Sequence, residues 1–198
     1  MSYPVAAGGR SADSINRKIA DRIKTGFGLT DEEYARMTPQ QATDSLLARK
    51  NRDPQTARLP YDLRFHGEIR QCGKVTSLRC TVYTLTGGAH GLLTNLFFNF
   101  DTESGKPLDK ADLFSDTAGL QRLNRQYFAK HLSDAALSED ALFVGTDQLP
   151  LPENVGIDSS GVTMLYNPYE VAPYAIGTIE YRIPYEQAEP LLKRIARR

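Results

Sequence analysis

Three β-rich stretches follow one another in the middle of this chain, with no helical stretch between them. They cover residues 61–71, 76–86 and 92–100, are rich in Val, Thr, Tyr and Phe, and are separated by turns that contain glycine. The simplest arrangement of such a segment is a three-stranded antiparallel meander. Because helical and strand-like stretches come in blocks rather than in βαβ alternation, the order favours an α+β fold.

The first 60 residues have the sequence patterns of helices. Residues 11–25 place Ile15, Ile19 and Ile23 four positions apart, which predicts a helix that begins at Ser11 and stops at Gly26. Residues 31–51 predict two short helices, the first from the capping-box spacing of Thr30–Glu33 and the second from Thr38 followed by Pro39. Asp53-Pro54 and Leu59-Pro60 end this helical part.

After the strands, helical spacing returns over residues 117–132, and strands are predicted near 154–157, 161–166 and 175–183, followed by a last helix over about 185–197. The expected fold is a mainly antiparallel sheet with N-terminal helices, a central helix and a C-terminal helix. A chain of 198 residues is long enough for one large core. We therefore expect a single domain over 1–198, with a helical part at 1–60 and a sheet-rich part at 61–198.

The charges are balanced overall but unevenly distributed. Equal numbers of acidic and basic residues argue against a nucleic-acid partner, yet residues 133–192 carry ten acids and the single base Arg182. Such a segment attracts a cationic partner or simply forms a solvated acidic face. No apolar run reaches the roughly 20 residues of a membrane-spanning helix. The first residues lack the pattern of a signal peptide, so the compartment is either the cytoplasm or, for a mature fragment, outside it.

No residue pattern points to catalysis, a cofactor or a metal. The three histidines have neither the i, i+4 spacing of a helical metal site nor an HExxH motif, and phosphate-binding and nucleophile-elbow motifs are absent. Cys72 and Cys80 allow at most one disulfide, and the expected strand register separates them. A pair of carboxylates for glycoside cleavage stays open, because such acids need not be close in sequence.

Two segments are informative. Gly87 and Gly88 predict a tight bend or bulge that places His90 at a turn, where it contacts main chain or a neighbouring carboxylate. Valine at Gly88 is expected to strain the backbone. Residues 166–177 form a loop stiffened by two prolines that carries Tyr169, Glu170 and Tyr174. These tyrosines either make a contact surface or pack on the sheet.

Both segments resemble the PdaC/RsiV-like family, in order and in spacing. The residues that carry the likeness are Gly87–His90, Phe98–Asp101 with Gly105-Lys106, Asp112–Phe114 and Tyr166–Tyr174, with a weaker likeness at Tyr3-Pro4 and Ile15–Ile19. The resemblance implies an extracytoplasmic, periplasmic or cell-envelope domain, found in one branch beside a peptidoglycan deacetylase and in another as a lysozyme-binding sensor. It carries over no catalytic residues.

The expected function is therefore non-catalytic binding, with no cofactor. The first hypothesis is a sensor, inhibitor or immunity protein that binds a basic wall-lytic enzyme such as a lysozyme. The alternatives are a peptidoglycan-binding accessory domain and, less favoured, a glycosidase or deacetylase. The candidate binding residues are Tyr169, Glu170, Tyr174, Glu153, Asp158 and His90.

Overall fold

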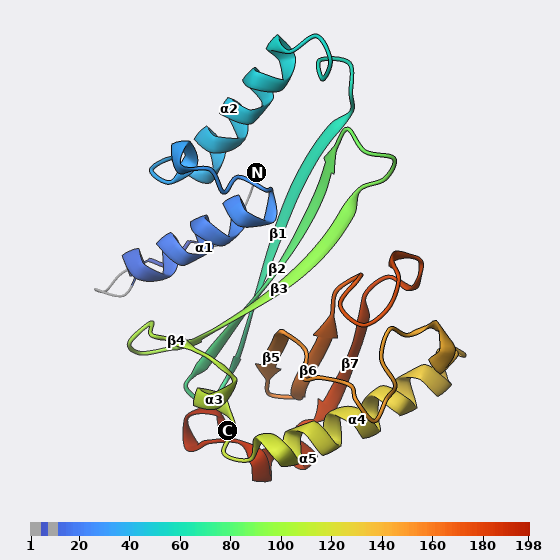
Figure 1. The fold of residues 1–198 in the computed structure, drawn as a ribbon. Helices are drawn as coiled ribbons and strands as arrows, with labels where there is room; N and C mark the ends of the chain where they lie inside the picture. The colour runs from blue at the N-terminus through green and yellow to red at the C-terminus, as the bar shows by residue number, and fades with distance from the viewer. Residues whose placement is uncertain (1–4, 8–11) are drawn as a thin grey trace. The chain divides into compact units, whose positions relative to one another are not determined.

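The computed structural model describes residues 5–7 and 12–198, and it confirms the α+β class (Figure 1). The chain divides into two compact units. The first comprises Met1–Gly67 and Cys80–Thr94, and the second comprises Glu68–Arg79 and Asn95–Arg198. The boundary between them runs through three strands. The expected helix cap Ser11 and the Tyr3-Pro4 likeness lie outside the described residues.

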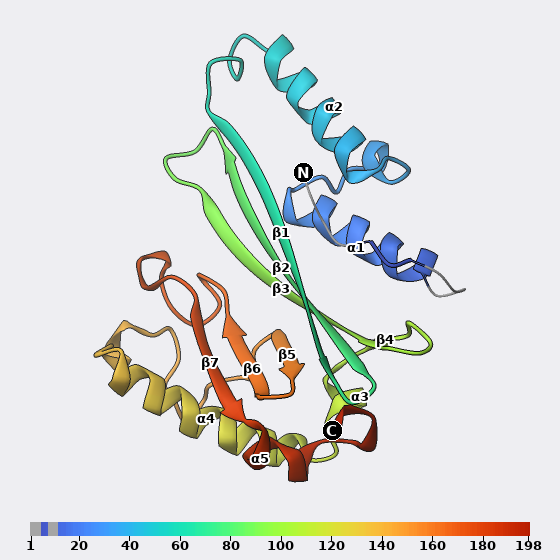
Figure 2. The same ribbon diagram turned by 180° about the vertical axis from the view of Figure 1, so that it is seen from behind.

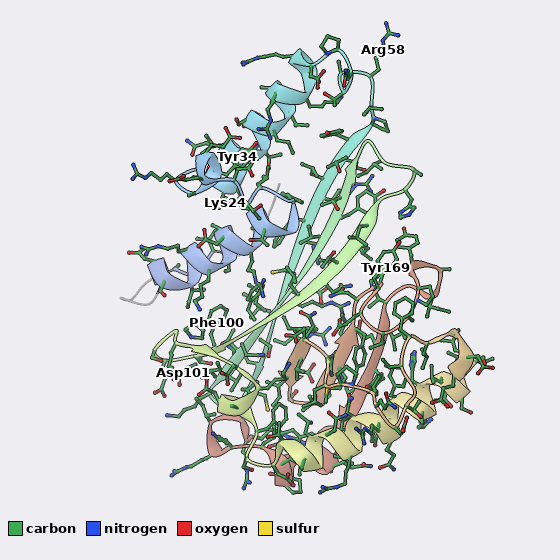
Figure 3. The ribbon with its side chains drawn as sticks, viewed as in Figure 1. Lys24, Tyr34, Arg58, Phe100, Asp101 and Tyr169 are labelled. Carbon is green, nitrogen blue, oxygen red and sulfur yellow. The ribbon has the colours of Figure 1, made fainter. Side chains whose placement is uncertain are left out.

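The first unit contains two helices that pack on each other, α1 (Ala12–Gly26) and α2 (Pro39–Arg52) (Figure 2). Ile19 and Ile23 of the predicted stripe are buried. The buried Lys24 donates from Nζ to the main-chain oxygens of Tyr34 and Ala35, at 3.1 Å each (Figure 3). This ammonium satisfies carbonyl groups at the end of the connecting 3₁₀ turn η1 (Glu32–Tyr34).

The second predicted cap is confirmed and the first is wrong. Thr38 accepts a hydrogen bond from the main-chain N–H of Gln41, Gln41 returns one to Thr38, and Pro39 opens α2. At Thr30, by contrast, no α-helix begins. The chain makes only η1, preceded by Asp31 without a side-chain cap.

The predicted meander is confirmed. Strands β1 (Tyr61–Cys72), β2 (Val75–Thr86) and β3 (Leu92–Asp101) lie in this order in one sheet, extended by the short β4 (Pro107–Leu108). Gly87 and Gly88 lie in the bend between β2 and β3, as expected. Gly87 has a left-handed φ of 86°, whereas Gly88 does not. The conformational constraint is therefore at Gly87, and the strain expected for valine at Gly88 is wrong.

The later strands form a second antiparallel sheet, ordered β5-β6-β7, in the second unit. They are β5 (Asn154–Asp158), β6 (Gly161–Tyr166) and β7 (Ile179–Pro184). The predicted central helix is present as α4 (Thr117–Asp134), which packs against β7 and follows the short α3 (Lys110–Leu113) (Figure 1). Every residue of β6 is buried, so this strand forms the centre of the core.

The predicted helix over 185–197 is wrong. α5 covers only Tyr185–Ala188 and is followed by two 3₁₀ turns, η4 (Glu189–Leu191) and η5 (Arg194–Ala196). Pro190 cannot donate a helical hydrogen bond. The segment instead bonds to the rest of its unit: Lys193 N donates to Leu113 O at 2.8 Å, and Lys74 N donates to Ile195 O at 2.9 Å. The strand predicted from 175 likewise begins only at Ile179, after the turn η3 (Tyr174–Ile176).

Cys72 and Cys80 are both buried free thiols. Burial raises the pKa of Cys80 to about 12, which disfavours the reactive thiolate. None of the helices formed by the described residues is long and apolar enough to cross a membrane.

Candidate protein-binding surface

The loop between β6 and β7 begins with a side chain that binds β3. Asn167 Oδ1 accepts from Asn95 N at 2.7 Å, and Asn167 Nδ2 donates to Asn95 O at 2.8 Å. The amide thus satisfies both main-chain groups of Asn95, as a neighbouring strand would. The start of the loop is therefore fixed within the second unit.

Glu170 braces the loop from inside. Its Oε2 accepts from Asn167 N at 2.9 Å, and its Oε1 accepts from Glu153 N at 3.0 Å. The structure thus brings together Glu170 and Glu153, two of the predicted binding residues. Because each carboxylate oxygen already has a main-chain donor, Glu170 holds the loop in shape.

Tyr169, the neighbour of Glu170 in the loop, is exposed on the surface. Its side chain is 55% exposed, and its backbone has a φ of 72°, a left-handed conformation that is unusual for a residue other than glycine (Figure 3). Tyr169 N donates to Ala172 O at 3.0 Å, which keeps the turn closed. The ring stacks on Tyr174 with 5.9 Å between centroids. The alternative in which this ring packs into the sheet is therefore wrong for Tyr169, while Tyr174 is half-buried beneath it.

A second tier of contacts fixes Asn95, the residue that Asn167 binds. Arg79 forms two hydrogen bonds with Glu180, of 2.9 and 2.8 Å, and a third of 3.1 Å to the side-chain oxygen of Asn95. A paired guanidinium and carboxylate of this geometry is more rigid than a single-point ion pair. The loop thus rests on an ordered polar network.

Phe143 is a surface residue that the sequence analysis missed. Its side chain is 56% exposed, and its main-chain N–H donates to Val171 O at 2.9 Å, within the same loop. Its neighbours Leu142 and Val144 pack against the core and anchor the segment. An aromatic residue inside the acidic stretch 139–147 was the available signal. Phe143, Tyr169 and Tyr174, which we call the aromatic patch, come from two segments that this hydrogen bond joins, and Phe143 and Tyr169 are its exposed members.

Asp158 does not join the loop. It lies at the far end of β5, five residues beyond Glu153 and roughly 16 Å away along the extended chain. Its Oδ2 lies 3.1 Å from Arg70 and 3.2 Å from Arg182. Partial burial opposes ionisation, but the hydrogen bonds from Ser160 and the two arginines hold the pKa of Asp158 below its usual value. The expectation that it supports the loop is wrong.

His90 belongs to the first unit, in the bend after Gly87 and Gly88. As predicted, it contacts main chain, with Nδ1 3.1 Å from Gly91 O. Across the described residues, no three His, Cys, Asp or Glu side chains are grouped so that they could hold a metal ion.

Basic residues elsewhere in the second unit offset part of the negative charge of residues 133–192. The second unit has sixteen acidic and thirteen basic residues. Five acids of the stretch lie within 4.0 Å of a basic nitrogen, namely Asp134, Glu153, Asp158, Glu180 and Glu186. The field that could attract a cationic partner is correspondingly weaker than a count of residues 133–192 suggests.

These features define a two-sheet α+β protein with an exposed aromatic patch beside its second sheet. Residues 111–186, which contain α4 and that whole sheet, match the model of a family described as a protein of unknown function (DUF3298). No curated protein matches the chain.

Two solved structures described as DUF3298 family proteins share the fold. The one from Bacteroides fragilis NCTC 9343 has a TM-score of 0.63 and 23% identity, covering 98% of this chain and 83% of its own. The one from Pseudomonas aeruginosa PAO1 has a TM-score of 0.64 and 17% identity, covering 97% and 90%. At these identities the likeness concerns the fold, and the PdaC/RsiV-like resemblance stays a prediction.

Proposed function

We propose that this protein is a non-catalytic binding module of the cell envelope that recognises a protein through its aromatic patch. The observation that carries the proposal is the pair Tyr169 and Tyr174, stacked and held at the surface by a loop whose main chain is hydrogen-bonded within the unit. Tyrosine is enriched at the energetically dominant positions of protein interfaces.

The loop is suited to binding because it is already ordered. Association costs free energy when loops and side chains lose freedom, and a segment fixed in advance avoids much of that cost. Glu170 and Asn167 supply this order, and the left-handed Tyr169 places its ring in solvent. A left-handed non-glycine residue is a strained conformation of the kind that concentrates at functional sites.

The proposed partner is a basic wall-lytic enzyme of the lysozyme kind, for which the protein would act as sensor, inhibitor or immunity protein in the periplasm or another extracytoplasmic space. This follows from the PdaC/RsiV-like resemblance and from the excess of acids in the second unit. Because that excess is small, we expect charge to raise the association rate modestly and the tyrosines to set the lifetime of the complex.

The test is the binding kinetics of the protein on an immobilised basic muramidase, at low and at physiological ionic strength. Tyr169→Ala should speed dissociation about tenfold, the loss of roughly 1.4 kcal/mol of anchoring. Ile69→Ala is the matched control, since Ile69 is exposed and apolar, belongs to the same unit and lies outside the loop. Absence of binding by the unmodified protein at low ionic strength would rule out this partner, and native kinetics in Tyr169→Ala would remove the loop from the contact.

Peptidoglycan is the second candidate ligand, favoured by the same exposed rings, which can stack on sugar faces. The two proposals differ in their response to salt. Binding to a neutral glycan should persist at high salt, while a charge-assisted protein contact weakens. Sedimentation with purified cell wall in high salt separates them: co-sedimentation that depends on Tyr169 favours the glycan.

A further inference from the structure

A pocket of about 280 Å³ adjoins the loop within the second unit. It lies where β3, the chain around the start of α3 and the start of β5 come together. Its lining consists of Phe97, Asn99, Leu108, Asp109, Lys110, Glu153 and Val155. Glu153 connects the pocket and the loop, because its main-chain N–H donates a hydrogen bond to Glu170 Oε1 at 3.0 Å.

The walls of the pocket are rigid. The Phe97 ring lies against Gly156, where a Cβ atom would come within 2.2 Å of it, so the glycine lets the ring lie close to the strand. The buried Asn99 accepts from Ser77 Oγ at 2.5 Å and donates to Val155 O at 2.9 Å. With Leu108 and Val155, these side chains form a wall that combines polar and apolar groups, and Phe97, Leu108 and Val155 are its apolar part.

Two carboxylates at the rim of the pocket, those of Asp109 and Glu153, can accept further hydrogen bonds. Asp109 Oδ1 accepts from Asp112 N, which leaves its second oxygen for another donor. The Glu153 side chain is 86% exposed, and its carboxylate lies 3.9 Å from Lys110 Nζ, beyond hydrogen-bond distance. Lys110 instead donates to Pro152 O at 2.8 Å. Lys110 is the one basic residue of the lining, so Asp109 and Glu153 leave the pocket with one negative charge in excess.

We propose that this pocket receives a lysine or arginine side chain of the protein partner. The aliphatic stem would lie along Phe97, Leu108 and Val155, and the cationic head would bind between Asp109 and Glu153. Lysine and arginine side chains commonly lie with their aliphatic stems along apolar surface and their charged ends in polar surroundings. The inference rests on the proposed function, because it supplies a charged anchor beside the aromatic patch and so explains selection of a basic partner.

The pocket can be tested without the partner, by titrating isotope-labelled protein with N-acetyl-lysinamide and N-acetyl-argininamide and following amide shifts by NMR. We expect saturable shifts at Phe97, Asn99 and Val155, with a dissociation constant on the order of 10 mM, as befits one side chain. N-acetyl-norleucinamide, which lacks the charge, should bind at least fivefold more weakly. The double variant Asp109→Asn, Glu153→Gln should abolish the shifts, whereas Asp140→Asn, which neutralises an exposed acid of the same unit outside the pocket, should retain them.

The outcomes separate this inference from the proposed function. Shifts with the cationic probes but no binding to a basic muramidase would support the pocket and reject that partner. Tyr169-dependent muramidase binding that the double variant leaves unchanged would overturn the pocket. Equal shifts with the neutral probe, or saturable shifts with N-acetylglucosamine in place of the cations, would also overturn it.

Discussion

Asn167 binds both main-chain groups of Asn95, with hydrogen bonds of 2.7 and 2.8 Å, although 72 residues separate the two in sequence. An asparagine amide presents a donor and an acceptor side by side, as a peptide group does, so it can pair with a strand where no further strand follows. This contact, with Glu170 above it, makes the aromatic loop part of the folded unit.

Replacing Asn167 by Ala should destabilise the protein by about 1–3 kcal/mol, because the buried Asn95 loses the two main-chain hydrogen bonds that Asn167 makes. Chemical denaturation measures this loss. Asn51→Ala, at an exposed asparagine of α2, is the control and should change stability by less than about 0.5 kcal/mol. Equal stability of both variants would mean that water replaces the amide at no cost.

Gly87→Ala should destabilise the protein by roughly 1–2 kcal/mol, because alanine disfavours the left-handed backbone at this position. Its Cβ would also lie 2.8 Å from the Leu59 side chain. Gly88→Ala is the adjacent control: its Cβ would meet only His90 O, at 3.8 Å, an ordinary contact. Thermal melting should separate the two, and a greater loss for Gly88→Ala would contradict the bend described above.

Asn124→Ala should cost roughly 2–4 kcal/mol, since Asn124 is fully buried between two tyrosine hydroxyl groups. Asn124 Nδ2 donates to Tyr166 Oη at 2.8 Å, and Asn124 Oδ1 accepts from Tyr181 Oη at 2.7 Å. Burial raises the pKa of Tyr166 to about 12 and raises that of Tyr181 too, so both hydroxyls stay neutral donors. Urea unfolding measures the effect, and a loss below about 1 kcal/mol would show that the hydroxyl groups find other partners.

Asp158→Asn should destabilise the protein in a pH-dependent way. The folded pKa of Asp158 lies below the unfolded value of about 3.9, so the ionised carboxylate contributes stability above that pH and loses it as the pH falls through the folded pKa. The difference in unfolding free energy between the original protein and the variant should therefore be largest near neutral pH and shrink below about pH 4. Asp140→Asn, at an exposed acid, serves as control. A difference that is constant from neutral pH to about pH 3 would contradict the ion pairs with Arg70 and Arg182.

The local pattern of the chain determined most of its secondary structure. The isoleucine spacing of α1, the cap formed by Thr38 and Pro39, the three strands of the meander and the spacing of α4 all appear where the sequence predicts them. These features depend on neighbours a few residues apart, through side-chain periodicity and turn chemistry, and so can be read without the fold. The presence of an aromatic loop over 166–177 was accessible for the same reason.

Long-range contacts decided what local patterns could not. The C-terminal segment looked helical but forms turns, because Pro190 interrupts the helix and Leu113 and Lys74 supply other hydrogen-bond partners. Asp158 looked like part of an acidic surface, yet Arg70, 88 residues earlier in the chain, pairs with it. The exposure of Tyr169, the hydrogen bond that joins Phe143 to its loop and the pocket around Phe97 likewise depend on packing between distant segments. Sequence spacing carries little information about such distances, because the free energy that selects them comes from burial and pairing that exist only once the chain has folded.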